Sequence, residues 1–173
     1  GIQENVDINT QEITTETVII TQGIFENLSL EGFASNENVD NAFEAVIDGE
    51  DFIADSISAT ATTQNGVVNR SIVANNTTTN QNITMVITGP ITEGSYLFST
   101  PNAAISATAL YNADVTSGGN SFISQTGGQL TITSYDDASG VLVGTFEFVG
   151  EDILQQTTDT YTITEGSFTV TFQ

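Results

Sequence analysis

From Phe43 to its end, the chain consists of short runs in which apolar and polar residues alternate, separated by clusters of Gly, Asn and Asp. An alternation of period two places every second side chain on the same face of a β-strand. Between these runs, Asp48-Gly49 and Asn65-Gly66 are dipeptides that favour type I′ hairpin turns. Helical periodicity with capping residues is missing here. The pattern predicts an all-β fold, either an antiparallel β-sandwich or a closed β-barrel of about 9–11 strands.

The strand signals also predict where each strand begins and ends. We expect strands at 43–47, 52–61, 67–74, 83–88, 95–99, 103–111, 121–124, 129–135, 141–149, 158–164 and 167–172. Gly127-Gly128 and Glu165-Gly166 are predicted to be turns that each separate two successive strands.

One three-residue motif occurs three times, as Gly94-Ser95-Tyr96, Gly144-Thr145-Phe146 and Gly166-Ser167-Phe168. In each copy the hydroxyl is expected to face water and the aromatic residue to start a buried face. Before the second copy, Val141 and Val143 lie at odd positions, whereas the aromatic residues that follow lie at even positions, which predicts a bulge at Gly144. A phosphate-binding role for these glycines is not favoured, because no predicted helix follows them and no basic residue is near.

The charged residues exclude several classes of function. The chain has 22 Asp and Glu but only one cationic side chain, Arg70, and it has no Lys, His, Cys or Trp. It therefore lacks a Schiff-base lysine, a histidine base, a thiolate and a basic surface for nucleic acid. The acidic pairs Glu50-Asp51, Asp136-Asp137 and Glu151-Asp152 are interpreted as solvated loop residues. We predict that the protein is not an enzyme and has no catalytic residues and no bound cofactor, apart from the calcium considered below.

The acids are unevenly distributed along the chain. Thirteen of the 22 precede residue 56, whereas 56–135 contains only Glu93 and Asp114. Residues 1–16 are acidic and contain few apolar residues, so we predict a poorly ordered N-terminal tether there. Residues 17–173 are predicted to form a single β domain with a first strand at 17–23. No run of about 18 apolar residues is present, so a membrane span is not expected in this sequence.

Calcium is the metal that the composition favours, because Ca²⁺ is bound by carboxylate, carbonyl and amide oxygens. The candidate ligands are acids in predicted turns: Asp48, Asp51, Asp114, Asp136, Asp137 and Asp152. None of these loops matches an EF-hand, and ordinary turns require the same residue types. Arg70 is expected to form a surface ion pair with a neighbouring acid, or else to bind an anion.

Five short motifs follow one another along the chain: FEAVIDGEDF (43–52), GSY (94–96), LTI (130–132), GTFEF (144–148) and ITEGSF (163–168). This order resembles an uncharacterised family of secreted lipoproteins in Bacteroidetes, over a core of residues 43–172. The resemblance implies export and attachment to the cell envelope through a lipid anchor upstream of this sequence. It implies no activity and no catalytic residue. The lack of a signal and of a lipidated Cys is a departure from the family that a trimmed chain would explain.

Taken together, these features predict an exported, envelope-tethered domain with a non-enzymatic binding or structural role, at the cell surface or in the outer membrane. The partner would be a glycan or a surface protein. The alternative is a carbohydrate-binding or adhesive module, with or without Ca²⁺, that contacts glycan through Tyr96, Tyr111, Tyr135 or Tyr161. A carboxylate-based glycoside hydrolase is the least favoured, because stacking Trp residues are missing.

Overall fold

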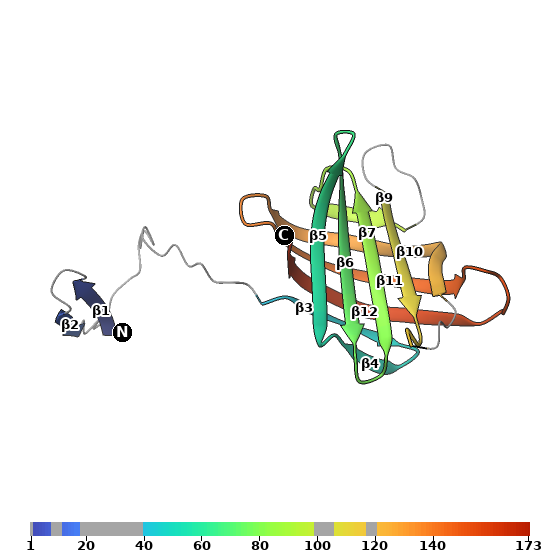
Figure 1. Ribbon diagram of the computed structural model, residues 1–173, viewed down its shortest axis with the longest axis horizontal. Helices are drawn as coiled ribbons and strands as arrows, with labels where there is room; N and C mark the ends of the chain where they lie inside the picture. The colour runs from blue at the N-terminus through green and yellow to red at the C-terminus, as the bar shows by residue number, and fades with distance from the viewer. Residues whose placement is uncertain (1, 8–11, 18–39, 99–105, 117–120) are drawn as a thin grey trace, which may run out of the picture. The chain divides into compact units, whose positions relative to one another are not determined.

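The computed structural model describes residues 2–7, 12–17, 40–98, 106–116 and 121–173 (Figure 1). The chain divides into two compact units, Gly1–Glu37 and Asn38–Gln173. In the first unit, β1 (Ile2–Asp7) pairs antiparallel with β2 (Glu12–Thr17). The strand expected at 17–23 lies outside the described residues, apart from Thr17.

The second unit is an antiparallel β domain, which confirms the predicted all-β class. Its strands are β3 (Ala42–Ile47), β4 (Glu50–Ile53), β5 (Ser56–Gln64), β6 (Val67–Asn76), β7 (Gln81–Thr88), β8 (Gly94–Leu97), β9 (Ser106–Asn112), β10 (Ser121–Asp136), β11 (Val141–Asp152) and β12 (Thr160–Thr171). The described residues contain no helix that could span a membrane.

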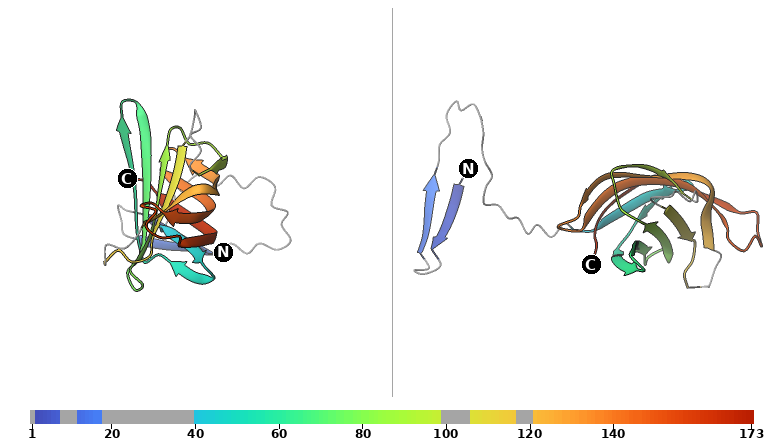
Figure 2. Two further views of the ribbon diagram at one scale, coloured as in Figure 1. Left: turned by 90° about the vertical axis from the view of Figure 1, so that its right-hand side faces the viewer. Right: turned by 90° about the horizontal axis from the view of Figure 1, so that it is seen from above.

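The ten strands form one sheet that curls around its own core into a half-barrel (Figure 2). The strand order is β4-β3-β12-β11-β10-β9-β7-β6-β5, with β8 added on β10. The two edge strands, β4 and β5, are consecutive in the chain. In addition, the backbone of Gln173, just after β12, hydrogen-bonds to Ala59 and Ala61 of β5. The short connection keeps β4 and β5 close, and the hydrogen bonds hold β5 next to the end of β12.

Both predicted hairpin turns are present. Asp48 and Gly49 have φ values of 50° and 91°, and Asn65 and Gly66 have φ values of 53° and 79°. Positive φ at both central residues is what a type I′ turn requires. The side chain of Asp48 also accepts a hydrogen bond from the backbone N–H of Thr162 at 2.8 Å, which joins this turn to the start of β12.

Two other predicted turns are bulges inside continuous strands, so these two predictions were wrong. In β10 the register shifts between Ser124 and Gly128, and in β12 it shifts between Thr164 and Ser167. Gly128 has a φ of 116°, and a Cβ there would lie 2.6 Å from the Cβ of Phe148. The bulge in β10 lets its first part pair with β9 and its second part with β8.

The bulge predicted at Gly144 is not present in β11. Its buried side alternates without interruption through Leu142, Gly144 and Phe146, while Val141 and Val143 lie on the other face. The sequence was ambiguous because, in an uninterrupted Val-Leu-Val run, either the odd-numbered or the even-numbered residues can face the core. The register shift lies instead in the neighbouring strand, between residues 132 and 134 of β10.

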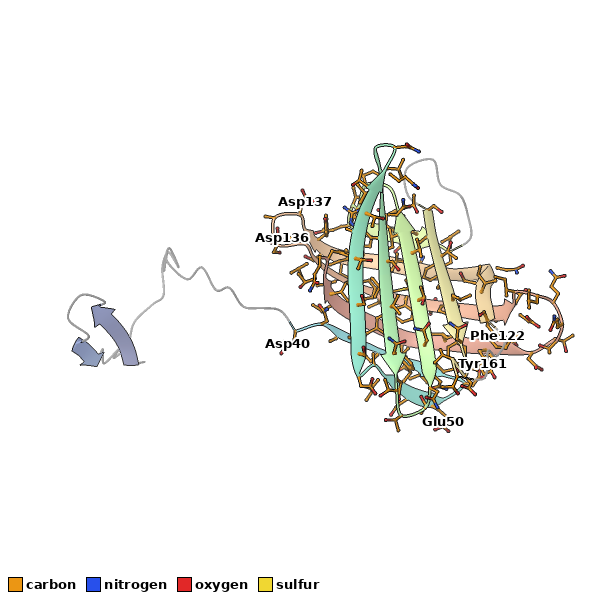
Figure 3. The ribbon with its side chains drawn as sticks, viewed as in Figure 1. Asp40, Glu50, Phe122, Asp136, Asp137 and Tyr161 are labelled. Atoms are coloured by element: carbon orange, nitrogen blue, oxygen red, sulfur yellow. The ribbon has the colours of Figure 1, made fainter. Side chains whose placement is uncertain are left out.

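Aromatic residues fill much of the concave side. Phe43 contacts Phe146 at 5.0 Å and Phe168 at 6.2 Å between ring centroids. Near the other end of the sheet, Tyr161 contacts Phe122 at 4.5 Å (Figure 3). Aromatic pairs at these separations stabilise a core beyond the area that they bury.

Candidate functional site

The three Gly-hydroxyl-aromatic motifs meet on the outer, convex face of the sheet. Their hydroxyl residues Ser95, Thr145 and Ser167 all point outward, because the Gly and the aromatic residue of β11 and β12 face the core. The register places Thr131 opposite both Ser95 and Thr145, and Ser167 opposite both Thr145 and Glu44. Ser95 and Thr131 hydrogen-bond at 2.9 Å, and Ser167 donates to Glu44 at 3.1 Å. The result is a polar row that crosses β8, β10, β11, β12 and β3.

The glycines of these motifs make room for aromatic rings. Gly144 lies opposite Phe168, and Gly166 lies opposite Phe146. A Cβ on Gly166 would lie 2.6 Å from ring atoms of Phe146, and a Cβ on Gly144 would lie 2.7 Å from the ring of Phe168. The motifs of β11 and β12 therefore each combine a ring that packs over a glycine of the neighbouring strand inside with a hydroxyl outside.

The bulge of β12 contains Glu165, which lies beside this polar row. Glu165 has a φ of 53°, which is unusual for a residue other than Gly, Asn or Asp. Two hollows lie on either side of it. One, of about 250 Å³, is also lined by Asp51 and Ile53, and the other, of about 320 Å³, is also lined by Gln129 and Glu147. We call the two hollows together the outer groove. Residues in sparsely populated backbone conformations cluster at active sites and ligand-binding sites.

The outer groove has the chemistry of a hydrogen-bonding surface. Its carboxylates belong to Glu44, Asp51, Glu147 and Glu165, and its hydroxyls belong to the polar row. Gln129 adds an amide that can both donate and accept. None of the residues that line either hollow is a cation. The groove can therefore bind hydroxyl-bearing or positively charged ligands, but it contains no His, Cys or Lys that could act as base or nucleophile.

Among the predicted calcium ligands, Asp152 is the most enclosed, with 4% of its surface exposed. Its carboxylate accepts hydrogen bonds from the backbone N–H groups of Leu154, Gln156 and Thr157 at 2.8 to 2.9 Å. Burial alone would raise the pKa of Asp152, but these donors together hold the pKa below its ordinary value. The residue organises the loop between β11 and β12.

Three other candidates stabilise turns. Asp114 accepts from the N–H and hydroxyl of Thr116, and Asp136 accepts from Ser139 and from the N–H of Ala138. The Ser139 hydroxyl, followed by the Ala138 N–H, lowers the pKa of Asp136. Asp137 accepts a hydrogen bond from the hydroxyl of Tyr135 at 3.0 Å.

The structure does not bring these acids together. Asp136 and Asp137 lie well away from Glu50, which precedes Asp51 in β4 (Figure 3). Asp48 is in the turn before β4, and its carboxylate is engaged by β12. No group of three or more acids in the described part of the chain is arranged to hold a metal ion. A specific calcium site stays a prediction.

The four tyrosines that were predicted to contact glycan are buried or half-buried. Tyr111 is buried, and Tyr161 contacts its ring at 4.9 Å inside the domain. Tyr96 donates its hydroxyl to the carbonyl of Thr92, and Tyr135 is half-buried. Burial, followed by the nearby Tyr161, raises the pKa of Tyr111 to about 12.

Arg70 is not part of a surface ion pair. It is only 8% exposed and donates to the carbonyl of Gly89 at 3.1 Å and to the hydroxyl of Tyr135 at 3.3 Å. Its guanidinium also lies 5.3 Å from the centroid of the Tyr135 ring. Tyr135 in turn donates to Asp137, so a hydroxyl connects the cation to a carboxylate. The surface prediction failed because β6 turns its even-numbered residues inward.

The fold and the outer groove define an antiparallel half-barrel domain with a polar groove on its convex face. The chain belongs to the family described as Domain of unknown function (DUF6252), whose match covers residues 39–171. Searches among curated proteins and among solved structures found no match. The family match spans the whole β domain from just before β3 to the end of β12.

Proposed function

We propose that this chain is an exported, envelope-tethered domain with a non-enzymatic binding role, and that its ligand lies in the outer groove. The observation that carries this proposal is the position of Glu165. This residue lies in the bulge of β12 with a positive φ and lines both hollows, one of which is also lined by Thr131, Thr145 and Ser167 of the polar row. Bulges are over-represented next to active sites, and residues in unusual backbone conformations cluster at functional sites.

The groove supports binding more than catalysis. Its carboxylates lie on an exposed sheet face, and its lining contains no histidine or other basic residue. Enzyme sites are usually deeper and combine several polar groups within an apolar pocket. The cell-envelope location is supported by the resemblance of the motifs to secreted lipoproteins, with a lipid anchor upstream of residue 1.

Fractionation of the native host tests the location. The full-length protein should appear in the envelope fraction and should be digested when intact cells are treated with protease. Recovery in the cytoplasmic fraction, with full protection until the cells are broken, would contradict export.

A carbohydrate-binding role is the second candidate, because hydroxyls, an amide and carboxylates are the groups that bind sugar hydroxyls. A glycan array with the whole chain, with and without Ca²⁺, tests it. Glu165→Gln and Glu147→Gln should weaken any glycan signal, whereas Glu50→Gln, an exposed acid of β4 outside the groove lining, should not. If all three variants bind like the original chain, the groove is not the binding site. A signal that requires Ca²⁺ but not Mg²⁺ would support a calcium-dependent module.

A further inference from the structure

The outward face of β5, β6, β7 and β9 carries no charged side chain. These four strands lie side by side, and Figure 1 views them from this face. Every second residue of 56–62, 69–75, 82–88 and 106–112 points outward there, and each of these residues is Ser, Thr, Asn, Val or Leu. We call this surface the neutral face. These four strands all lie within the acid-poor segment 56–135, which also contains β8 and most of β10.

The opposite outer face, over β10, β11, β12 and β3, is acidic because it contains the outer groove. Charge is therefore segregated on the domain, whose full chain has a formal net charge of -21. Two copies of such a chain repel each other within about 8 to 10 Å at physiological salt. If two copies make contact through their neutral faces, no carboxylate on the outer sheet faces of one copy lies directly against a carboxylate of the other.

The neutral face also has the layout of an interface. At its centre, Thr84 lies opposite Val73 on β6 and Leu110 on β9. Val86, one position along the same face of β7, is diagonal to both of these apolar residues and is 37% exposed. Hydroxyl and amide side chains surround this apolar centre. An apolar centre with a polar rim is typical of protein interfaces.

We propose that the neutral face binds the neutral face of a second copy, forming a symmetric two-layer dimer. This inference does not depend on the outer groove. Four strands at about 4.8 Å spacing and seven residues at about 3.3 Å each cover roughly 440 Å² per copy, or about 900 Å² for the pair. This area belongs to the class of weak, reversible interfaces. We therefore expect a dissociation constant on the order of micromolar or weaker.

The salt dependence of dimerisation tests the proposal. Sedimentation velocity of the whole chain, over a series of concentrations, should give a dimer fraction that rises from about 0.05 M to about 0.5 M NaCl. Added salt screens the repulsion between the two acidic molecules, so the dissociation constant should fall several-fold. A dimer held together by ion pairs would show the opposite trend. A chain that stays monomeric at about 0.5 mM in 0.5 M NaCl would overturn the proposal.

Two matched substitutions locate the interface. Val86→Glu places a carboxylate at the centre of the neutral face, and Val149→Glu makes the same change on the outward side of β11, where Val149 is 38% exposed. We expect Val86→Glu to be monomeric at all salt concentrations and Val149→Glu to dimerise like the original chain. If Val86→Glu fails to fold by circular dichroism, Thr108→Glu, opposite Val86 on β9, replaces it. Equal dimerisation of the neutral-face variant and Val149→Glu would overturn the proposal.

Discussion

Replacing Gly166 by Ala tests whether the packing of rings over glycines sets the geometry of the domain. A Cβ at this position would lie 2.5 Å from the carbonyl oxygen of Phe146 and 2.6 Å from two atoms of its ring. Both distances are far below ordinary contact, and the carbonyl belongs to the backbone of β11, so it cannot rotate away. Overpacking of this kind typically costs up to about 3 kcal/mol, and we expect Gly166→Ala to lower the free energy of unfolding by about 2 to 3 kcal/mol.

Urea denaturation followed by far-ultraviolet circular dichroism measures this change, since the chain lacks Trp as a fluorescent probe. For a domain of this size the expected loss corresponds to a decrease of about 6 to 12 °C in the thermal midpoint. Gly150→Ala is the comparison, because the nearest atom to a Cβ there is the Cβ of Phe122 at 2.9 Å. The loss for Gly150→Ala should be clearly smaller.

A double variant separates the ring from the backbone. Phe146→Leu removes the ring atoms but leaves the carbonyl oxygen in place, so in its background Gly166→Ala should still be destabilising, although less than alone. If Gly166→Ala changes the stability by less than about 0.5 kcal/mol, β12 can move away from β11 without loss and the reasoning is refuted. Complete rescue by Phe146→Leu would show that the ring alone, and not the backbone contact, creates the requirement for glycine.

Three further predictions concern ionisation and charge. Because the folded pKa of Asp152 is lowered, its contribution to stability is present at neutral pH and is lost as the pH falls through the folded value. Urea titrations at several pH values should therefore show that Asp152→Asn loses less stability on acidification than the original chain. Because the folded pKa of Tyr111 is raised to about 12, its contribution to stability is present below the ordinary pKa of 10.0 and is lost as the pH rises toward 12. Tyr111→Phe should remove this loss of stability at alkaline pH. An unchanged loss would show that another group causes it. Raising NaCl from millimolar to molar should increase the thermal midpoint by screening 22 acids, and a few millimolar Mg²⁺ should act like Ca²⁺; stabilisation by Ca²⁺ alone would indicate a dedicated site.

Local residue patterns were sufficient to predict most of the strands and the two tight hairpins, although the single strand expected at 52–61 is divided into β4 and β5. Asp48-Gly49 and Asn65-Gly66 adopt positive φ because Asp-Gly and Asn-Gly dipeptides favour type I′ turns by themselves, whatever the rest of the fold. Gly127-Gly128 and Glu165-Gly166 have similar composition but lie within continuous strands. The sequence could not distinguish a turn from a bulge, because the difference depends on whether partner strands continue on both sides.

The candidate site was only partly visible in the sequence. The repeated Gly-hydroxyl-aromatic motif was recognised, but each copy was interpreted separately as the start of a buried strand. The alignment of Ser95, Thr145 and Ser167 in one row depends on the register between strands that are far apart in the chain. The burial of Arg70 was likewise not visible in the sequence. It depends on the tertiary contacts of β6, through which Arg70 hydrogen-bonds to Gly89 after β7 and to Tyr135 of β10.

The sequence by itself determined the all-β class, the acidic character and the position of the acid-poor segment, because each depends on residue type and on neighbours along the chain. The tertiary structure decided that one sheet curls into a half-barrel and that β10 and β12 continue through bulges. It also decided that four strands of the acid-poor segment form a neutral face opposite an acidic groove. The physical reason is that strand partners are chosen by burial and register across the whole chain. No local pattern specifies which outward side chains will become neighbours.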